Sequence, residues 1–210
     1  MRRLEWFFDF VSPFSYLAFI RLAEFPEGVD IVCRPVLFAG LLNHWNQKGP
    51  AEIPPKRAWT NRWCTWSAER LGVRFCFPAV HPFNPLPHLR LAIAAGNTPH
   101  AIEQIFETIW TTGADPSDAA AFDALRSSLG VEQSKLSSPE IKNALRSATE
   151  QAVSYGIFGV PTLRIDGELF WGVDATDFAR AYLADPALLH SEKMHRLISL
   201  PFGAARKAAG

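Results

Sequence analysis

Residues 7–18 read FFDFVSPFSYLA, a stretch in which aromatic residues lead into a Ser-Pro step and then into a helical pattern. Apolar residues occupy every second position of residues 4–10, the period of two that predicts a β-strand. Residues 14–23 have the apolar spacing of a helix, and residues 29–37 predict a second strand. The beginning of the chain therefore predicts a strand-helix-strand unit.

The end of the chain predicts a further piece of a sheet. Residues 162–165 and 168–171 are short strands divided by Asp166-Gly167, a dipeptide typical of hairpin turns, and residues 174–183 return to helical spacing. The chain between the two ends is helical in pattern, with helices expected at residues 58–71, 87–95, 99–111, 116–129 and 140–155. We therefore expect an α/β fold in which a large all-helical domain is inserted into a small sheet domain.

Length and composition limit the class of protein. With 210 residues, of which 48% are hydrophobic, the chain can bury roughly 70% of its unfolded surface. Lys plus Arg and Asp plus Glu number 21 each, so no net charge draws the chain to nucleic acid or to an anionic membrane surface. The apolar runs are too short for a signal peptide or a membrane span. We expect a cytoplasmic protein whose partner is a small molecule.

The cysteines and histidines give no sign of a metal site. Cys33, Cys64 and Cys76 form no Cys-x-x-Cys pair and have no histidine at ligand spacing, so we expect reduced thiols in or near the core. His81 and His88 are separated by three prolines, which argues against shared metal ligation. No metal site is assigned.

Ser12 allows two interpretations. The sequence repeatedly sets a capping side chain before a proline at the first helical position, as in Thr98-Pro99, Asp115-Pro116, Ser138-Pro139 and Asp185-Pro186. By the same pattern Ser12 is a helix cap. Its place after the first strand favours a working hydroxyl, because the amides and the dipole at a helix N-terminus stabilise an anion, including a thiolate.

A second informative stretch, YGIFGVPTLRIDGELFWGVD, covers residues 155–174. Pro161 opens a strand and has no amide hydrogen to donate. If the preceding bond is cis, the backbone of Val160 turns outward and can pair with an extended peptide ligand. The sequence leaves the isomer of this bond open.

Taken together, F-D-F-V-S-P-F-S-Y-L-A, F-G-V-P-T and W-G-V-D resemble the 2-hydroxychromene-2-carboxylate isomerases and the related kappa-class glutathione transferases. The resemblance spans nearly the whole chain and implies a thioredoxin-like fold with the architecture of DsbA. It implies a discontinuous thioredoxin-like domain at residues 1–38 and 157–190, an inserted helical domain at residues 39–156, and a C-terminal helix and tail at residues 191–210.

The resemblance also implies a chemistry. Disulfide oxidoreductases carry Cys-x-x-Cys where this chain has Ser12-Pro13-Phe14-Ser15, so dithiol redox chemistry is not available. In the related isomerases the thiol is that of glutathione, and Ser12 aligns with the catalytic serine whose hydroxyl stabilises the ionised sulfur. The implied reaction interconverts 2-hydroxychromene-2-carboxylate and trans-o-hydroxybenzylidenepyruvate.

The resemblance implies that Val160, Pro161 and Asp174 are further positions that bind glutathione. Val160, before Pro161, matches the residue whose backbone holds the cysteinyl part. Asp174 in W-G-V-D matches the acidic residue that meets the γ-glutamyl ammonium group, and without the resemblance a helix cap is the alternative interpretation. The chain departs from the family at Val173 and Ala175, where relatives often carry Asn or Ser and Arg.

By the same resemblance, Lys56 matches a lysine that can approach glutathione or the aromatic carboxylate substrate, and Asn46 and Asn84 match positions where the family places polar contacts to its ligand, glutathione. Unaided, Lys56 reads as a solvated loop charge and Asn84 as a cap before Pro85. Where relatives carry Tyr and Asp, this chain has Trp59 and Trp63, followed by Trp66. These tryptophans are either a core stripe or an aromatic wall for a flat ligand. Trp110 is expected in the core.

Three functions remain open at this stage. The first is a glutathione-dependent isomerase of aromatic degradation, the second a kappa-like glutathione transferase or peroxidase, and the third a thioredoxin-fold binding protein without catalysis. The resemblance further implies a homodimer.

Overall fold

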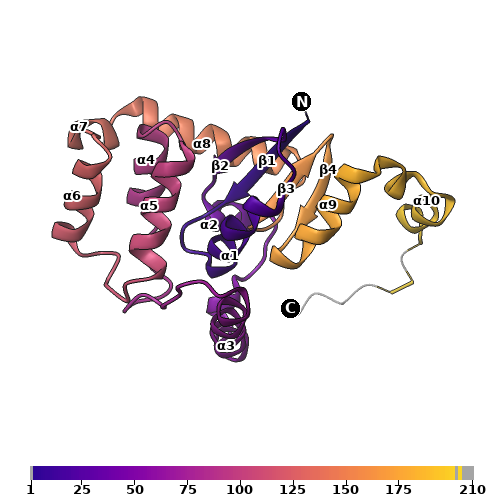
Figure 1. The fold of residues 1–210 in the computed structure, drawn as a ribbon, viewed down its shortest axis with the longest axis horizontal. Coiled ribbons are helices and arrows are strands. Elements are labelled where there is room, and N and C mark those ends of the chain that lie inside the picture. The colour runs from indigo at the N-terminus through magenta and orange to yellow at the C-terminus, as the bar shows by residue number, and fades with distance from the viewer. Residues whose placement is uncertain (1, 202, 205–210) are drawn as a thin grey trace.

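The computed structural model describes residues 2–201, 203 and 204. Within them, β1 (Arg3–Phe8), β2 (Asp30–Pro35), β3 (Thr162–Ile165) and β4 (Glu168–Trp171) form one mixed sheet in the order β2-β1-β3-β4. Strands β1 and β2 are parallel, whereas β3 runs antiparallel to β1 and to β4. Both ends of the chain thus build one sheet, as the sequence predicts (Figure 1).

The predicted helices are present, with shifted ends. Their bounds are α1 (Pro13–Arg21), α2 (Phe38–His44), α3 (Pro54–Leu71), α4 (Leu86–Ala94), α5 (Pro99–Trp110), α6 (Ala119–Ser128), α7 (Gln133–Leu136), α8 (Pro139–Ser154), α9 (Thr176–Ala184) and α10 (Glu192–Ile198). Short 3-10 helices, η1 (Leu22–Glu24), η2 (Pro50–Glu52), η3 (Val173–Ala175) and η4 (Pro186–His190), connect them. The expected helices omit α2 and α7, which are too short to show a clear period.

One predicted cap is wrong. The Asp115 side chain accepts a hydrogen bond from the amide of Ser117 within a turn, and α6 begins later, after Asp118. The Asp118 carboxylate accepts from the amides of Ala120 and Ala121. A proline after a polar residue fits a turn as well as a helix start, so the dipeptide alone does not locate the helix.

The sheet is covered on both faces. Leu4, Trp6 and Phe8 belong to the larger core cluster, and the Trp6 and Phe8 rings stack with their centroids 4.1 Å apart. Phe7 points to the other face, into a second cluster with Val36, Leu41, Ala152, Ile157 and Val160. Burial of a Phe side chain stabilises a fold by about 2 kcal/mol, so this second layer makes a real contribution.

Glu5 shows how a charge is accommodated in that covered sheet. Its side chain is buried, and its two oxygens accept hydrogen bonds from Arg34 at 2.8 Å and from Arg164 at 2.8 Å. The arginines come from the strands on either side of β1. Burial alone raises the pKa of Glu5, but the two guanidinium groups outweigh it and hold the pKa below its usual value.

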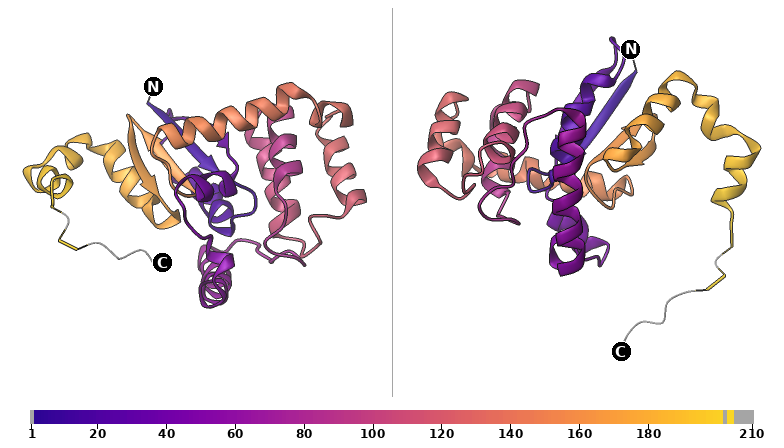
Figure 2. Two further views of the ribbon diagram at one scale, coloured as in Figure 1. Left: turned by 180° about the vertical axis from the view of Figure 1, so that it is seen from behind. Right: turned by 60° about the horizontal axis from the view of Figure 1, so that its bottom comes forward.

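Helices α4, α5, α6 and α7 lie to one side of the sheet, and α8 returns from them across its face to β3 (Figures 1 and 2). Helix α3 projects from the body at the base of the sheet, and α9 and α10 lie on the opposite side from α4 and α5 (Figure 1). The domain boundaries named above stay predictions. Of the predicted tail, residues 202 and 205–210 lie outside the described residues.

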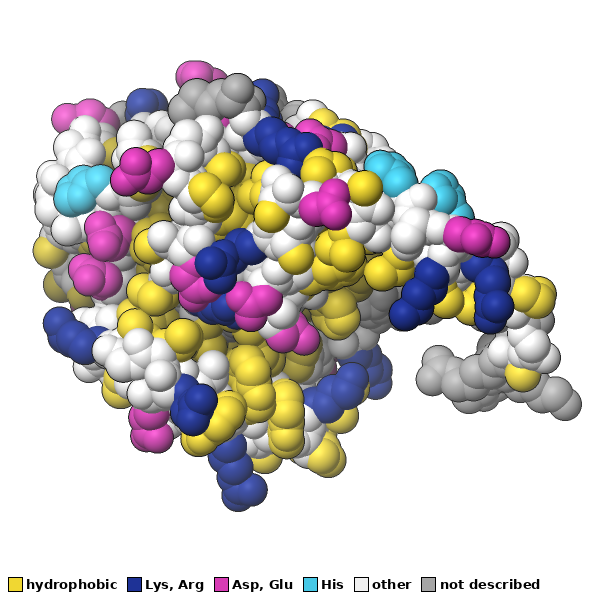
Figure 3. Space-filling model, turned by 45° about the vertical axis from the view of Figure 1, so that its right-hand side comes forward, with side chains coloured by type: hydrophobic (Ala, Val, Ile, Leu, Met, Phe, Trp, Pro, Cys, Tyr) yellow, Lys and Arg dark blue, Asp and Glu magenta, His cyan; other side chains and the backbone are white. Residues whose placement is uncertain are grey.

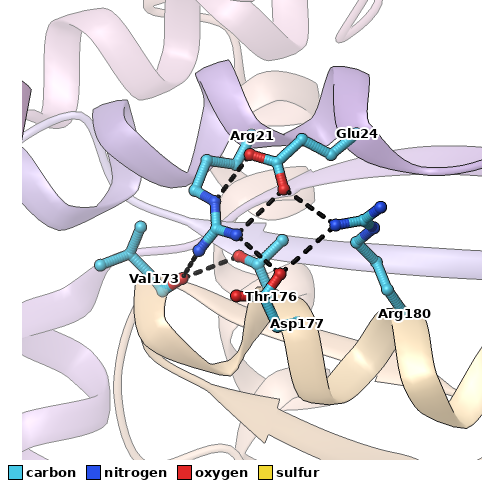
Figure 4. A network of polar contacts seen from close by, with 6 residues as sticks. All are labelled: Arg21, Glu24, Val173, Thr176, Asp177 and Arg180. Carbon is cyan, nitrogen blue, oxygen red and sulfur yellow. Dashed lines mark hydrogen bonds and ion pairs between the residues drawn. The ribbon is translucent and has the colours of Figure 1, made fainter. Parts of the chain in front are cut away.

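A network of charged side chains ties the first helix to the last part of the fold (Figure 4). Arg21 donates to Glu24 at 2.8 Å, to Asp177 at 3.0 Å and to the carbonyl of Val173 at 3.0 Å. Arg180 reaches Glu24 and Asp177 at 3.3 Å each. Because the Arg21 side chain is mostly buried and bonds a main-chain carbonyl, this contact fixes η3 against α1.

On one part of the surface, hydrophobic side chains form a group and do not occur only singly. Hydrophobic side chains gather on the lower part of the face in view in Figure 3, beside Lys and Arg side chains. Cys33 and Cys64 are buried, whereas Cys76 is exposed, so the expectation of core thiols is wrong for Cys76. None of the helices in the described part of the chain is both long and apolar enough to cross a membrane.

Candidate active site

A cavity of about 490 Å³ opens beside the N-terminus of α1. Its walls come from five places in the chain: the β1-α1 loop, α2 with the loop after it, the start of α3, the loop before α4, and the residues that flank β3 and β4. The volume falls in the range of small-molecule sites. Parts of the sequence far from one another therefore meet where the first helix begins.

Ser12 lies in the wall of this cavity, 6% exposed. Its backbone is extended, and its Oγ accepts a hydrogen bond from the amide of Ser15 at 3.2 Å, so the predicted cap is confirmed. That bond uses a lone pair of the oxygen and leaves the hydroxyl proton free to donate. Cap and donor are therefore compatible, and a sulfur or oxygen anion at this helix N-terminus can receive the Ser12 proton.

Asp9 is a fully buried carboxyl that also lines the cavity. Its oxygens accept hydrogen bonds from the amides of Val11 at 3.0 Å and Phe38 at 2.8 Å. Burial raises the pKa of Asp9 to about 7, although the amide hydrogen bonds act in the opposite direction. Asp9 therefore changes charge near neutral pH within the wall that holds Ser12.

His81 is a third polar member of the wall. Burial lowers its pKa below the ordinary 6.5, against the effect of its hydrogen bond to the Val11 carbonyl. The ring is therefore neutral at physiological pH. It is half-enclosed by Phe77 and Trp110, whose ring centroids lie 5.6 and 5.5 Å from its own.

The remaining lining combines cations with aromatic rings. Lys48, Lys56 and Arg57 supply positive charge, and Glu52, whose Oε1 accepts from the Gly49 amide at 2.6 Å, is the second carboxylate of the lining after Asp9. Phe14, Phe38, Phe83, Phe158 and Trp171 supply apolar surface. A basic and aromatic cavity suits a flat organic acid.

Gly159 and Trp171, two lining residues of the cavity, approach each other closely. A Cβ placed there would lie 2.6 Å from the Nε1 atom of Trp171, which packs edge-on against Phe158. We expect Gly159→Ala to push the Trp171 ring off the rim and to cost about 1–2 kcal/mol of unfolding free energy. The indole resonance of Trp171 in nitrogen-15 spectra reports the displacement, and an unshifted resonance would contradict it.

The structure brings only part of the predicted site together. Ser12, Lys56 and Val160 line the cavity, whereas Asn46, Asn84, Pro161 and Asp174 are not among its lining residues. The Val160-Pro161 bond is cis. Asn46 is exposed in a left-handed turn after α2, next to Gln47 and Lys48, which do line the cavity.

Asn84 and Asp174 have local explanations. Asn84 accepts a hydrogen bond from the amide of Leu86 at 3.1 Å and lines a separate groove near α4 and α6. Asp174 is exposed in η3, and its Oδ1 atom lies so close to Gly172 that it would overlap a Cβ placed there. As sites for glutathione, both remain predictions.

The tryptophans of α3 fit neither expectation. Trp59 and Trp66 are 59% and 54% exposed, so they are not a core stripe. Trp63 packs against Phe14, with the ring centroids 5.4 Å apart, yet none of the three is among the residues that line the cavity. Trp110 is fully buried, as expected.

The described lining contains no thiol, and no group of three potential metal ligands occurs in the described part of the chain. A sulfur nucleophile at Ser12 would therefore have to come from a ligand. Asp9 and His81 were missed by sequence reasoning. A polar residue ending an apolar strand is a weak signal for Asp9, and no pattern places the His81 loop against Ser12.

Comparison with known proteins identifies the family of this chain. A family model described as "DSBA-like thioredoxin domain" matches residues 3–184. The chain belongs to this family. The thioredoxin-like α/β fold with its helical insertion is thereby confirmed, and so is the resemblance from which it was predicted. This DSBA-like domain has serine at both ends of the motif that begins at Ser12.

Two relatives extend along most of this DSBA-like chain. A 2-hydroxychromene-2-carboxylate isomerase of Sphingobium xenophagum is 29% identical over 197 residues, covering 88% of this chain and 99% of the relative. Glutathione S-transferase kappa 1 of Homo sapiens is 24% identical over 208 residues, covering 88% and 92%. A solved structure of a 2-hydroxychromene-2-carboxylate isomerase superposes with a TM-score of 0.72 at 23% identity, covering 94% of this chain and all of that one.

Proposed function

We propose that this protein is a glutathione-dependent isomerase that interconverts 2-hydroxychromene-2-carboxylate and trans-o-hydroxybenzylidenepyruvate, or a related intermediate of aromatic degradation. The observation that carries the proposal is Ser12, a buried hydroxyl with a free proton at a helix N-terminus, in a cavity wall without a thiol. The similarity to the Sphingobium xenophagum isomerase supports the choice of reaction.

The lining residues suit glutathione and an aromatic acid. Ser12 donates its proton to the sulfur, and the α1 dipole favours the negative charge there. The buried Val160 backbone lies in the same wall, where an extended peptide can run beside it. Lys56 and Arg57 attract carboxylates, and the aromatic rings provide surface for a flat substrate.

When bound, glutathione supplies a thiolate that adds reversibly to a conjugated double bond, so that rotation can follow before elimination. The protein's own part is to keep that sulfur ionised through Ser12 and to hold the substrate between the cations and the rings. Because addition and elimination cancel, no group is oxidised and the thiol is returned.

This balance gives the test. We expect purified protein to equilibrate 2-hydroxychromene-2-carboxylate with its open-chain isomer only when glutathione is present, with no loss of thiol over many turnovers. Absorbance follows the isomers, a thiol titration follows glutathione, and calorimetry measures its binding. S-methylglutathione, which fills the same space without an ionisable thiol, is the matched control and should not support turnover.

The alternatives give different results in the same assay. A kappa-like transferase, the function named for the human relative, consumes one thiol per turnover. A binding protein without catalysis leaves both isomers unchanged. Absence of any heat of glutathione binding would overturn the proposal. A cytoplasmic location and a homodimer are parts of the same proposal.

A further inference from the structure

The two peptide units that precede Ser12 are hydrogen-bonded on both sides. The amide of Val11 donates to the Asp9 carboxylate at 3.0 Å, and the amide of Ser12 donates to the Asp9 carbonyl at 3.1 Å. The carbonyls of the same two units, those of Phe10 and Val11, accept from side chains that are 100 and 70 positions away in sequence.

Both distant donors come from the helical segment between β2 and β3. Trp110, at the end of α5, donates its Nε1 hydrogen to the Phe10 carbonyl at 2.9 Å. The His81 Nε2 atom lies 2.9 Å from the Val11 carbonyl. Because a carbonyl only accepts, Nε2 carries the proton, and Nδ1 is left buried without a partner among the described residues.

The two donors support each other. Their ring centroids are 5.5 Å apart, and Phe77 packs edge-on against both, 5.6 Å from His81 and 5.4 Å from Trp110. The amide of Cys76 donates to the Trp110 carbonyl at 2.6 Å, which fixes the segment that carries Phe77 and His81 to the end of α5. Indole and imidazole are therefore held as one packed unit.

We propose that Trp110 and His81 are positioning residues that fix the orientation of the Ser12 hydroxyl through the carbonyls of Phe10 and Val11. This inference deepens the proposed function and rests on the proposed role of Ser12. Each peptide unit is planar, so a donor that holds its carbonyl also sets the backbone torsions on either side. Without the donors, the buried carbonyl of Phe10 and the partly buried carbonyl of Val11 lose their partners, and the loop turns to recover them. Trp110 is fully buried and is not a lining residue, so through it the helical segment acts on Ser12 without contact to the ligand.

The chain offers matched controls for both substitutions. Trp110→Phe removes the indole donor from a fully buried ring, and Trp6→Phe removes the same atoms from another fully buried indole whose Nε1 has no partner. His81→Leu removes the imidazole donor, and His88→Leu removes a buried imidazole that packs against Phe83 and Phe122 and has no hydrogen bond to the carbonyls of Phe10 or Val11. His81→Gln keeps a donor near the position of Nε2.

Two measurements are made on the wild type and on each of the five variants. Amide hydrogen exchange at Val11 and Ser12 is measured in the protein alone, and the ultraviolet absorbance of bound glutathione is measured against pH. We expect Trp110→Phe and His81→Leu each to speed exchange at Ser12 about tenfold and to lower the thiolate fraction about tenfold. The controls should change neither, and His81→Gln should restore most of the loss.

Equal effects of each variant and its control on both measurements would overturn the inference, because buried volume alone would then explain them. If Trp110→Phe does not fold, the comparison of His81→Leu with His81→Gln and His88→Leu decides the question. If wild-type protein binds no glutathione, the proposed function fails, while exchange at Ser12 still shows whether the two donors hold the loop.

Discussion

Replacement of Ser12 by alanine should reduce the thiolate fraction of bound glutathione about 30-fold at neutral pH and lower turnover by a similar factor. A hydrogen bond to a charged group is worth about 2 kcal/mol, which corresponds to that ratio. The Oγ atom also caps α1, so the variant should lose a further ~1 kcal/mol of unfolding free energy. Ultraviolet titration of the bound thiol and steady-state kinetics measure the first effect, and urea unfolding measures the second.

Two control variants separate the hydroxyl's chemistry from its structural part. Ser138→Ala removes the cap of α8, far along the chain, and should cost the same ~1 kcal/mol with normal turnover. Ser15→Ala removes a buried hydroxyl that has no partner among the described residues, so it should be neutral or stabilising. If Ser12→Ala changes stability as Ser138→Ala does and leaves thiol ionisation intact, Ser12 is a cap alone.

Replacement of Asp9 by asparagine should remove a large pH dependence of stability. The folded protein raises the pKa of Asp9 from 3.8 to about 7, because the carboxyl is buried. Between these values the folded protein keeps a proton that the unfolded chain has released. The contribution of Asp9 to the free energy of unfolding therefore falls by about 4 kcal/mol as the pH rises from 4 to 8. Asparagine contributes no such change.

The difference between the two proteins isolates this effect. His88 acts in the opposite direction, because burial lowers its pKa to about 4 and its stabilising contribution is lost as the pH falls below 6.5. Urea unfolding of both proteins at each pH removes that shared contribution. Asparagine also lacks one acceptor for the two amides, a cost that does not vary with pH. Parallel curves for wild type and Asp9→Asn would show that the carboxyl ionises as it does in water.

The parts of the fold that the sequence predicts well are those with a strong local period. The hairpin at residues 162–171 falls on β3 and β4, where Asp166 and Gly167 both have positive φ angles. The short helices α2 and α7 have too few residues for a period. The burial of Phe7 could not be predicted from the sequence either, because α2 and α8, from distant parts of the chain, cover the face of the sheet on which Phe7 lies.

The residues of the site also divide into those that the sequence predicts and those that it does not. Ser12 was found because its cap position is a local property of the strand-helix junction, and Lys56 and Val160 came with the family motifs. Asp9 and His81 were missed because their significance depends on what packs around them. The same holds for the tryptophans of α3, whose exposure depends on how far that helix projects from the body.

By itself, the sequence determined the strand-helix-strand beginning, the hairpin near the end, the helical segment between them and the place of Ser12 at a helix N-terminus. These follow from spacing and capping, which act over a few neighbouring residues. Only the tertiary structure decided that Asp9 is buried, that His81 and Trp110 reach the carbonyls before Ser12, and that Asp174 lies outside the cavity lining. Such facts depend on contacts between residues far apart in the chain, and desolvation and hydrogen bonding at those contacts exist only once the chain has folded.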